Sequence, residues 1–216
     1  MDLNLEDIRR EFKVGSLSRK DMPANPIEKL EAWLKEAIDL GVIEPTAIVV
    51  TTADKDGRPS SRTLLCKEID NGKVIFYTNY ESRKGQQIAE NPWVSVTFLW
   101  HQLERQIHVE GFCQKVPAEV SDAYFAKRSY TSRVGARISP QSRPIPGRSF
   151  IVTEFAKESL KYTGTLRKVP RPDSWGGYEV TPHRIEFWQG RESRLHDRFL
   201  YVLQEDGSWS LDRIAP

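Results

Sequence analysis

The chain has 216 residues, of which 38% are hydrophobic and 29% are charged, which is typical of a globular protein with one large domain or two small ones. Its formal net charge of +2 argues against a general polyanion-binding protein, which would be far more basic. No apolar run approaches the ~20 residues of a membrane span, and the polar N-terminal segment lacks the apolar region of a signal peptide. We therefore expect a cytoplasmic protein that binds neither nucleic acid nor membranes.

Two helices are predicted near the N-terminus. A short one over Asn4–Phe12 has an apolar face, and it could be a docking helix or a flap near a site. A longer one begins after Asn25, a good N-cap, with Pro26 at its first position, and it ends at Gly41, which suits a left-handed C-terminal residue. Its buried face is expected to carry the apolar residues at helical spacing: Ile27, Leu30, Leu34, Ala37 and Ile38.

From residue 47 onwards the apolar pattern changes to that of strands. The predicted strands are Ala47–Ala53, Ser60–Glu68, Lys73–Thr78, Trp93–Trp100, Arg105–Lys115, Trp175–Val180, Arg184–Gln189, Phe199–Gln204 and Trp209–Arg213. The predicted helical segments between them are Ser82–Glu90, Ala118–Lys127, Ser132–Ile138 and Phe150–Tyr162. Strands at both ends with helices inserted predict a mainly β (α+β) fold, one antiparallel barrel, in a single domain over 1–216 with an N-terminal helical flap at about 1–24.

Missing motifs exclude several chemistries. The chain has no glycine-rich dinucleotide or phosphate loop and no Gly-x-Ser-x-Gly elbow. Its four histidines form no close ligand pair, so we expect no metal site. Cys66 and Cys113 lack metal or redox spacing, and both lie in predicted strands. We expect them to be reduced, buried thiols in a reducing compartment.

Cationic side chains interrupt the second predicted strand, which contains Arg62 and Lys67. A charge inside an otherwise apolar strand is costly unless it is paired. The lysine could protect an edge strand from aggregation. Alternatively, both side chains could reach an anion at the rim of the sheet.

Two further features indicate an anion. The helix after Ser82 carries Arg83 and Lys84 in its first turn, where cations oppose the helix dipole and a bound phosphate would explain them. The segment Ala123–Thr153 contains no Asp or Glu. Its cations are Lys127, Arg128, Arg133, Arg137, Arg143 and Arg148. Such a segment is typical of a site for an anion, a nucleic acid or an acidic partner, although a solvated charged face is also possible.

The stretch Arg184–Arg198 alternates like a strand until Gly190 and then turns. If its last residues form a strand, Arg194, His196 and Arg198 point to the same face. One interpretation is a solvated end of a hairpin. The other is a site for a phosphorylated, planar ligand, because Arg offers a flat fork of donors and His titrates near neutral pH.

The same stretch, through Glu186–Gly190 and Arg194–Arg198, resembles the C-terminal signature of the pyridoxine (pyridoxamine) 5′-phosphate oxidase family. Further blocks that match occur in order from about residue 8 to the end of the chain. They are Arg9–Glu11, Arg62–Lys67, Phe76–Asn79, Ser82–Lys84, Leu103–Gln106, Tyr124–Phe125, Gln141–Ser142 and Ser174–Gly177. The resemblance implies a split β-barrel that binds flavin mononucleotide (FMN), in a homodimer whose interface forms two equivalent sites.

The resemblance also implies which residues form the site. FMN would be held by Arg62, Thr63, Leu64, Leu65, Cys66, Lys67, Tyr77, Thr78, Arg83, Lys84, Gln106, Gln141, Ser142, Trp188 and Arg198. The substrate would be held by Arg9, Lys67, Tyr124, Arg128, Ser132, Arg194 and His196. Of these, Arg194 and His196 would lie against the pyridine ring as catalytic residues.

The activity implied is the oxidation of pyridoxine 5′-phosphate and pyridoxamine 5′-phosphate to pyridoxal 5′-phosphate, with oxygen as the electron acceptor and hydrogen peroxide as a product. Two departures from the family pattern stand out: Phe12 replaces a frequent Tyr, and Lys127–Ser129 replaces a Ser-Arg-Pro while keeping Arg128. The alternatives are a split-barrel flavin reductase with another substrate, a non-catalytic carrier of flavin or pyridoxal phosphate, and a nucleic-acid binder that uses the acid-free segment.

Overall fold

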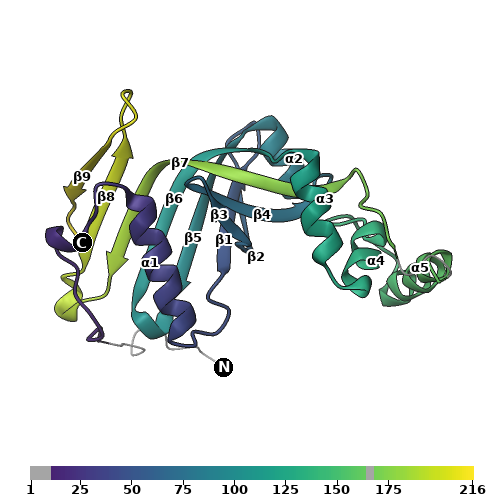
Figure 1. Ribbon diagram of the computed structural model, residues 1–216, viewed down its shortest axis with the longest axis horizontal. Coiled ribbons are helices and arrows are strands. Elements are labelled where there is room, and N and C mark those ends of the chain that lie inside the picture. The colour runs from purple at the N-terminus through teal and green to yellow at the C-terminus, as the bar shows by residue number, and fades with distance from the viewer. Residues whose placement is uncertain (1–10, 164–167) are drawn as a thin grey trace, which may run out of the picture. The chain divides into compact units, whose positions relative to one another are not determined.

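The computed structural model describes residues 11–163 and 168–216 (Figure 1). Within these residues the strands form one nine-stranded sheet in the order β2-β1-β5-β6-β7-β4-β3, with β8 paired to β7 and β9 paired to β8. The strands are β1 (Ala47–Ala53), β2 (Pro59–Leu65), β3 (Glu68–Asp70), β4 (Lys73–Asn79), β5 (Trp93–Trp100), β6 (Arg105–Lys115), β7 (Trp175–Gln189), β8 (Asp197–Leu203) and β9 (Trp209–Arg213). The α-helices are α1 (Pro26–Asp39), α2 (Arg83–Glu90), α3 (Ala118–Lys127), α4 (Tyr130–Ile138) and α5 (Arg148–Lys161).

The chain divides into two compact units, and four strands contribute residues to both. The terminal unit comprises residues up to Val50, Ser95–Gly111 and Pro182–Pro216. The central unit comprises Thr51–Val94 and Phe112–Thr181. The single domain expected from the sequence therefore stays a prediction. None of the helices in the described residues combines the length and the apolar composition needed to cross a membrane.

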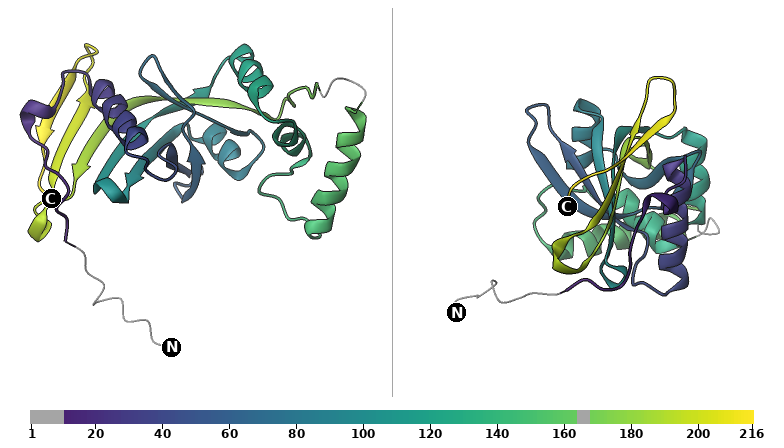
Figure 2. Two further views of the ribbon diagram at one scale, coloured as in Figure 1. Left: turned by 60° about the horizontal axis from the view of Figure 1, so that its bottom comes forward. Right: turned by 90° about the vertical axis from the view of Figure 1, so that its left-hand side faces the viewer.

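The terminal unit is built on α1 and the β7–β8–β9 strands. Asn25 caps α1 by accepting a hydrogen bond from the Ile27 N–H at 3.1 Å, and Gly41 follows it with φ +69°, as predicted. The apolar face of α1 packs Trp33 edge-on against Phe187, with ring centroids 5.4 Å apart. The β8–β9 hairpin, at the yellow end of the colour scale in Figure 2, extends this antiparallel sheet. Burial of aromatic and aliphatic surface is the main stabilising term for such a layer.

The central unit places β3, β4 and part of β7 in one antiparallel sheet, with α2 to α5 in the same unit. Tyr77 of β4 lies opposite Gly177 of β7. A Cβ at Gly177 would come within 2.8 Å of the Tyr77 ring and 2.7 Å of Val116. Glycine is therefore needed at this position, and it leaves room for the Tyr77 ring to lie across the strand.

The predicted elements agree with most observed ones, and β1, β5, β6, α3 and β9 have the predicted ends. The two strands predicted over 175–180 and 184–189 are a single strand, β7. Pro182 lies between the residues paired with β4, which end at Val180, and those paired with β8, which begin at Arg184. A residue without an N–H is tolerated there because neither of these two ladders uses it.

Other differences are smaller. The second predicted strand ends at Leu65, and Glu68 begins a separate short strand, β3. Ile38, predicted on the buried face of α1, is 51% exposed. The predicted N-terminal helix lies mostly outside the described residues, and Phe12, which is described, is not helical.

Candidate functional site

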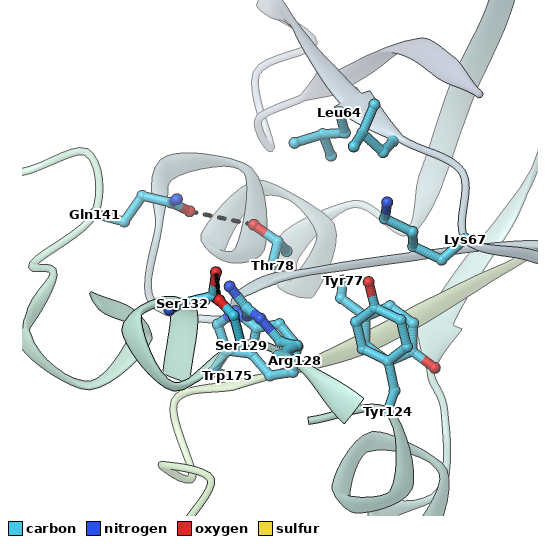
Figure 3. Close-up of a pocket in the computed structure, with 11 residues that line it drawn as sticks. Leu64, Lys67, Tyr77, Thr78, Tyr124, Arg128, Ser129, Ser132, Gln141 and Trp175 are labelled. Atoms are coloured by element: carbon cyan, nitrogen blue, oxygen red, sulfur yellow. Dashed lines mark hydrogen bonds between the residues drawn. The ribbon is translucent and has the colours of Figure 1, made fainter. Parts of the chain in front are cut away.

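A cavity of about 500 Å³ in the central unit brings together many of the predicted ligand-binding residues (Figure 3). Its lining comes from the end of β2 and the residues after it, from β4, from α3 and the start of α4, from the loop after α4 and from the start of β7. The lining residues are Leu64, Leu65, Lys67, Tyr77, Thr78, Tyr124, Arg128, Ser129, Ser132, Gln141 and Trp175. Segments far apart in the sequence thus meet at one polar and aromatic cavity.

One wall of the cavity is a stack of aromatic rings. Tyr77 and Tyr124 are nearly parallel, with centroids 3.8 Å apart, and Trp175 is stacked 5.6 Å from Tyr77. Burial raises the pKa of Tyr77 to about 12 and also raises the pKa of Tyr124. Both phenols therefore stay neutral at neutral pH, and the wall suits a flat, aromatic ligand.

Cations and hydroxyls lie beside this wall. The Arg128 guanidinium lies 4.4 Å from the centroid of the Trp175 ring, which is cation–π geometry. Arg128 also marks the end of α3, and Ser129 caps the start of α4 by accepting from the Ser132 N–H. The Ser129 hydroxyl donates to the Ser132 hydroxyl at 2.8 Å. A guanidinium, two hydroxyls and a helix N-terminus at one place form a suitable anion-binding group.

Lys84 lies in the same unit and is only 6% exposed. Its ammonium donates to the Thr78 hydroxyl at 3.1 Å, to the Ser82 hydroxyl at 3.2 Å and to Oε1 of Gln141 at 3.0 Å. Burial, followed by repulsion from Arg62, lowers the pKa of Lys84 to about 8. A buried cation whose hydrogen-bond acceptors are neutral oxygens remains electrostatically uncompensated, and a phosphate would compensate it.

The other predicted FMN residues of the central unit do not line the cavity. Arg62 donates to the hydroxyls of Thr52 and Ser60, and Arg83, the first residue of α2, is exposed. Thr63 is exposed. The Cys66 thiol is buried and donates to the Glu68 carbonyl, and burial raises its pKa to about 11. Cys113 is also buried, and both thiols are free, as predicted.

The sequence did not assign two of the lining residues. Ser129 follows Arg128, and the N-cap pattern of a serine before a helix was the available signal. Trp175 lay within a block that carried the family resemblance but had no role assigned to it. Ser142, which was assigned, is exposed with φ +70° and lies next to Gln141 outside the lining.

A second group of predicted residues lies in the terminal unit. The His196 ring is 4.6 Å from the Trp188 ring, and Phe12 contacts both edge-on, at 5.4 and 5.6 Å. Nδ1 of His196 accepts from the Arg191 backbone N–H at 3.1 Å, so the neutral ring carries its proton on Nε2. Burial, followed by Arg194 and Arg198, lowers the pKa of His196. The imidazole is therefore neutral at neutral pH.

Arg198 and Gln106 belong to the same unit. Arg198 lies opposite Trp188 in the β7–β8 ladder and forms a two-point ion pair with Glu186, at 2.7 and 3.0 Å. That hydrogen-bonded carboxylate raises the pKa of Arg198. Gln106 and Trp188 both line a smaller cavity of about 210 Å³ that also includes Phe12.

The predicted strand geometry of residues 194–198 is wrong. Arg194 ends a short 3-10 turn, and β8 begins only at Asp197. Ser193 and Arg194 have φ values of +55° and +60°, so the alternation that would align Arg194, His196 and Arg198 on one strand face does not exist. Arg194 is exposed. Arg9 lies outside the described residues.

No cluster of three or more His, Cys, Asp or Glu side chains in the described residues could hold a metal ion. The chemistry of both groups of residues is that of anion binding and aromatic stacking. Neither group offers the ligand geometry of a metal hydrolase.

Comparison with known proteins gives two family matches. Residues 34–162 match the model described as pyridoxamine 5′-phosphate oxidase. Residues 175–216 match the model described as pyridoxine 5′-phosphate oxidase C-terminal dimerisation region. The chain is also similar to the pyridoxine/pyridoxamine 5′-phosphate oxidase of Porphyromonas gingivalis, with 64% identity over 216 residues and 100% coverage of both chains.

Two solved structures are similar to the fold. PhzG from Burkholderia lata 383, in complex with tetrahydrophenazine-1-carboxylic acid, is 31% identical with a TM-score of 0.86, covering 94% of this chain and 99% of that one. A pyridoxamine 5′-phosphate oxidase-related, FMN-binding protein from Nostoc punctiforme is 17% identical with a TM-score of 0.71, covering 90% and 100%. These structural matches confirm the predicted antiparallel split-barrel fold with flanking helices.

Proposed function

Because this chain belongs to the pyridoxine/pyridoxamine 5′-phosphate oxidase family, we propose that it oxidises pyridoxine 5′-phosphate and pyridoxamine 5′-phosphate to pyridoxal 5′-phosphate, as an oxidoreductase of vitamin B6 metabolism. One structural observation carries the proposal. A single cavity combines a stack of aromatic rings with cations and hydroxyls, and this is the chemistry that a phosphorylated pyridine requires.

The substrate phosphate is proposed to bind Lys67, Tyr124, Arg128 and Ser132, all of which line the cavity. Lys67 and Arg128 supply positive charge, and the Ser132 hydroxyl adds a neutral donor at the start of α4. A substrate without phosphate would leave two cations in the cavity without an anion, so these residues also select for the phosphorylated forms.

FMN is the proposed cofactor, and the central unit fits a second phosphate. Lys84 is buried among neutral oxygens, and burial lowers its pKa, so a phosphate there would compensate its charge. The proposed FMN-binding residues are those implied by the family resemblance, of which Leu64, Leu65, Lys67, Tyr77, Thr78 and Gln141 line the cavity. When bound, the flavin supplies the acceptor for the hydride of the substrate's exocyclic carbon and the site of oxygen reduction to hydrogen peroxide.

Arg194 and His196 of the terminal unit are the proposed catalytic residues. A guanidinium can lie flat on an aromatic ring while it donates sideways. His196 is held by Trp188, Phe12 and the Arg191 N–H, and its Nε2 proton is the one left to donate to a substrate. Their proposed role is to orient the pyridine ring, so that the exocyclic carbon is correctly placed for hydride transfer.

A homodimer is part of the proposal because the model that matches residues 175–216 carries the description of a dimerisation region. We expect dilution to the monomer to release FMN. A cytoplasmic location is also proposed, and the two buried, free thiols, Cys66 and Cys113, suit a reducing compartment.

The test is a product assay on the purified, flavin-loaded protein in air. Pyridoxine 5′-phosphate should give equal amounts of pyridoxal 5′-phosphate and hydrogen peroxide, and pyridoxamine 5′-phosphate should give ammonia in addition. Binding of both substrates without product would support a carrier instead. Flavin turnover with other substrates but not with these two would support a split-barrel reductase.

A further inference from the structure

Helix α4 and the residues next to its two ends contribute to the lining of the cavity. Ser129, its N-cap, and Ser132, in its first turn, line the cavity at one end of the helix. Gln141, three residues beyond its last residue, lines the cavity as well and accepts hydrogen bonds from Lys84 and Thr78. Figure 3 shows these side chains directed toward the same space. A shift of α4 would therefore move hydroxyl and amide groups of the site together.

Apolar packing does little to hold α4 in place. Val134 is the one buried residue within this described helix. The neighbouring helix α5 is similar, because its one buried residue is a carboxylate, Glu158, which is 7% exposed. Several apolar side chains of α5 are exposed instead, including Leu160 at 75%. Since little apolar surface is buried on either helix within this chain, polar contacts are expected to contribute to their relative position.

A partly buried ion pair supplies such a contact. Nε of Arg137, on α4, lies 2.6 Å from Oε1 of Glu158, on α5. Arg137 also donates to the Pro170 carbonyl at 3.1 Å and lies 5.7 Å from the Tyr162 ring. Glu158 accepts further hydrogen bonds from Lys161 at 2.6 Å and from the Tyr162 hydroxyl at 3.2 Å. A second link between the helices runs from the Tyr130 hydroxyl to the Ser159 carbonyl at 3.0 Å.

The carboxylate of this pair is charged at neutral pH. Hydrogen bonds from Arg137, and then from Lys161, lower the pKa of Glu158. Hydrogen bonds between charged, partly buried groups are short and directional, so they fix a helix in angle as well as in distance.

We propose that the Arg137–Glu158 pair is a positioning device for substrate: it holds α4 where Ser129, Ser132 and Gln141 complete the phosphate-binding cavity. The inference rests on the proposed function for the identity of the ligand. Arg137 touches neither substrate nor cofactor in this proposal, and it acts through the helix. Misplacement of a binding group by about 1 Å can cost ~100-fold, and a partial loosening of α4 should cost less than that.

The test is Arg137→Met, which keeps the aliphatic stem and leaves Glu158 bound to Lys161 and Tyr162. We expect KM for pyridoxamine 5′-phosphate to rise about tenfold, with kcat of the flavin-loaded enzyme unchanged within about twofold. The matched control is Lys157→Met, which removes a cation whose ion pair with Glu154 lies within α5. It should change neither constant. Arg137→Lys, which keeps charge but loses the planar fork, should fall between wild type and Arg137→Met.

Hydrogen exchange separates this inference from the proposed function. Amides of α4 should exchange faster in Arg137→Met than in wild type, while those of α3 should not change. If wild-type protein fails to oxidise pyridoxamine 5′-phosphate, the proposed function is wrong, and the exchange rates still decide the role of Arg137. A lower melting temperature with unchanged KM and unchanged exchange in α4, or equal effects in the Lys157→Met control, would overturn the proposal.

Discussion

Two groups of cations, one in each unit, differ in what surrounds them. In the terminal unit, Arg198 is paired with Glu186, and both Arg191 and Arg213 lie near Asp197. In the central unit, within the described part of the chain, Lys84 contacts neutral oxygens and Arg128 lies against aromatic rings, with no carboxylate bound to either.

The pKa directions follow the same division. Its carboxylate partner raises the pKa of Arg198, whereas burial lowers the pKa of Arg128 and of Lys84. A cation that is compensated within the protein stabilises the fold, and one that is not is available to a ligand's phosphate. The proposed recognition of phosphate therefore rests on the uncompensated cations of the central unit.

The largest expected effect concerns Arg194, which is exposed in the turn before β8. Arg194→Lys keeps the charge but loses the plane and the fork of donors. If Arg194 orients the pyridine ring, the rate of flavin reduction in anaerobic stopped-flow should fall ~100-fold. Flavin content and melting temperature should stay close to wild type. The control is Arg184→Lys, an exposed arginine of β7, which should be silent.

Reduction at the wild-type rate in Arg194→Lys would refute the catalytic role of Arg194. A collapse of the melting temperature would instead show that Arg194 belongs, like Arg198, to the structural cations of the terminal unit.

Lys67 tests the cations that are proposed to bind phosphate, because it lines the cavity of the central unit. Lys67→Ala should weaken ligand binding by ~1.5–3 kcal/mol, as expected for a charged hydrogen bond, and the fold should survive. Titration calorimetry with pyridoxal 5′-phosphate measures the loss. Lys55→Ala, in the exposed turn between β1 and β2, is the matched control. Wild-type affinity in Lys67→Ala would remove this lysine from the site.

The sequence predicted the ends of several elements but not the surroundings of the cations. The ends of several strands follow from local alternation and turn residues, and the ends of α1 follow from Asn25 and Gly41, since these signals act within a few residues. The burial of Lys84 could not be predicted, because one of its partners, Gln141, comes from a distant segment.

The backbone turn at Arg194 could not be predicted from the sequence for a different reason. Ser193 and Arg194 both adopt left-handed backbone angles, which non-glycine residues reach only when the surrounding structure demands it. An alternating pattern of Arg, His and Arg gives no sign of that demand. The pattern therefore suggested a strand where the chain turns.

Titration of Lys84 should make both FMN binding and the stability of the apoprotein depend on pH. Its pKa in the folded protein is about 8, below its ordinary value of 10.5. The ammonium is therefore present below about 8 and lost above it, and binding of FMN to the apoprotein should weaken ~10-fold from one pH unit below this pKa to one unit above. The contribution of Lys84 to the stability of the apoprotein should rise with pH between about 8 and 10.5, because in that range the unfolded chain holds its proton and the folded one does not. Lys84→Met should abolish both trends, and retention of the FMN trend in this variant would exclude Lys84 as its source.

The smallest effect is expected at a compensated cation of the terminal unit. Arg213 is paired with Asp197 at 2.9 Å and donates to the Leu17 carbonyl at 3.0 Å. Arg213→Met should lower the free energy of unfolding by about 1 kcal/mol, measured by urea denaturation. Affinity for pyridoxal 5′-phosphate should not change. A loss of affinity as large as that of Lys67→Ala would break the distinction between the two units.

The central claim is that uncompensated cations of the central unit select a phosphorylated substrate. The most direct test is the ratio of kcat/KM for pyridoxamine 5′-phosphate to that for pyridoxamine, in wild type, in Arg128→Met and in the neighbouring control Lys127→Met. The account predicts a ratio that falls roughly 10–100-fold in Arg128→Met, as for a lost charged hydrogen bond, and that stays at the wild-type value in Lys127→Met. An unchanged ratio in Arg128→Met would contradict it.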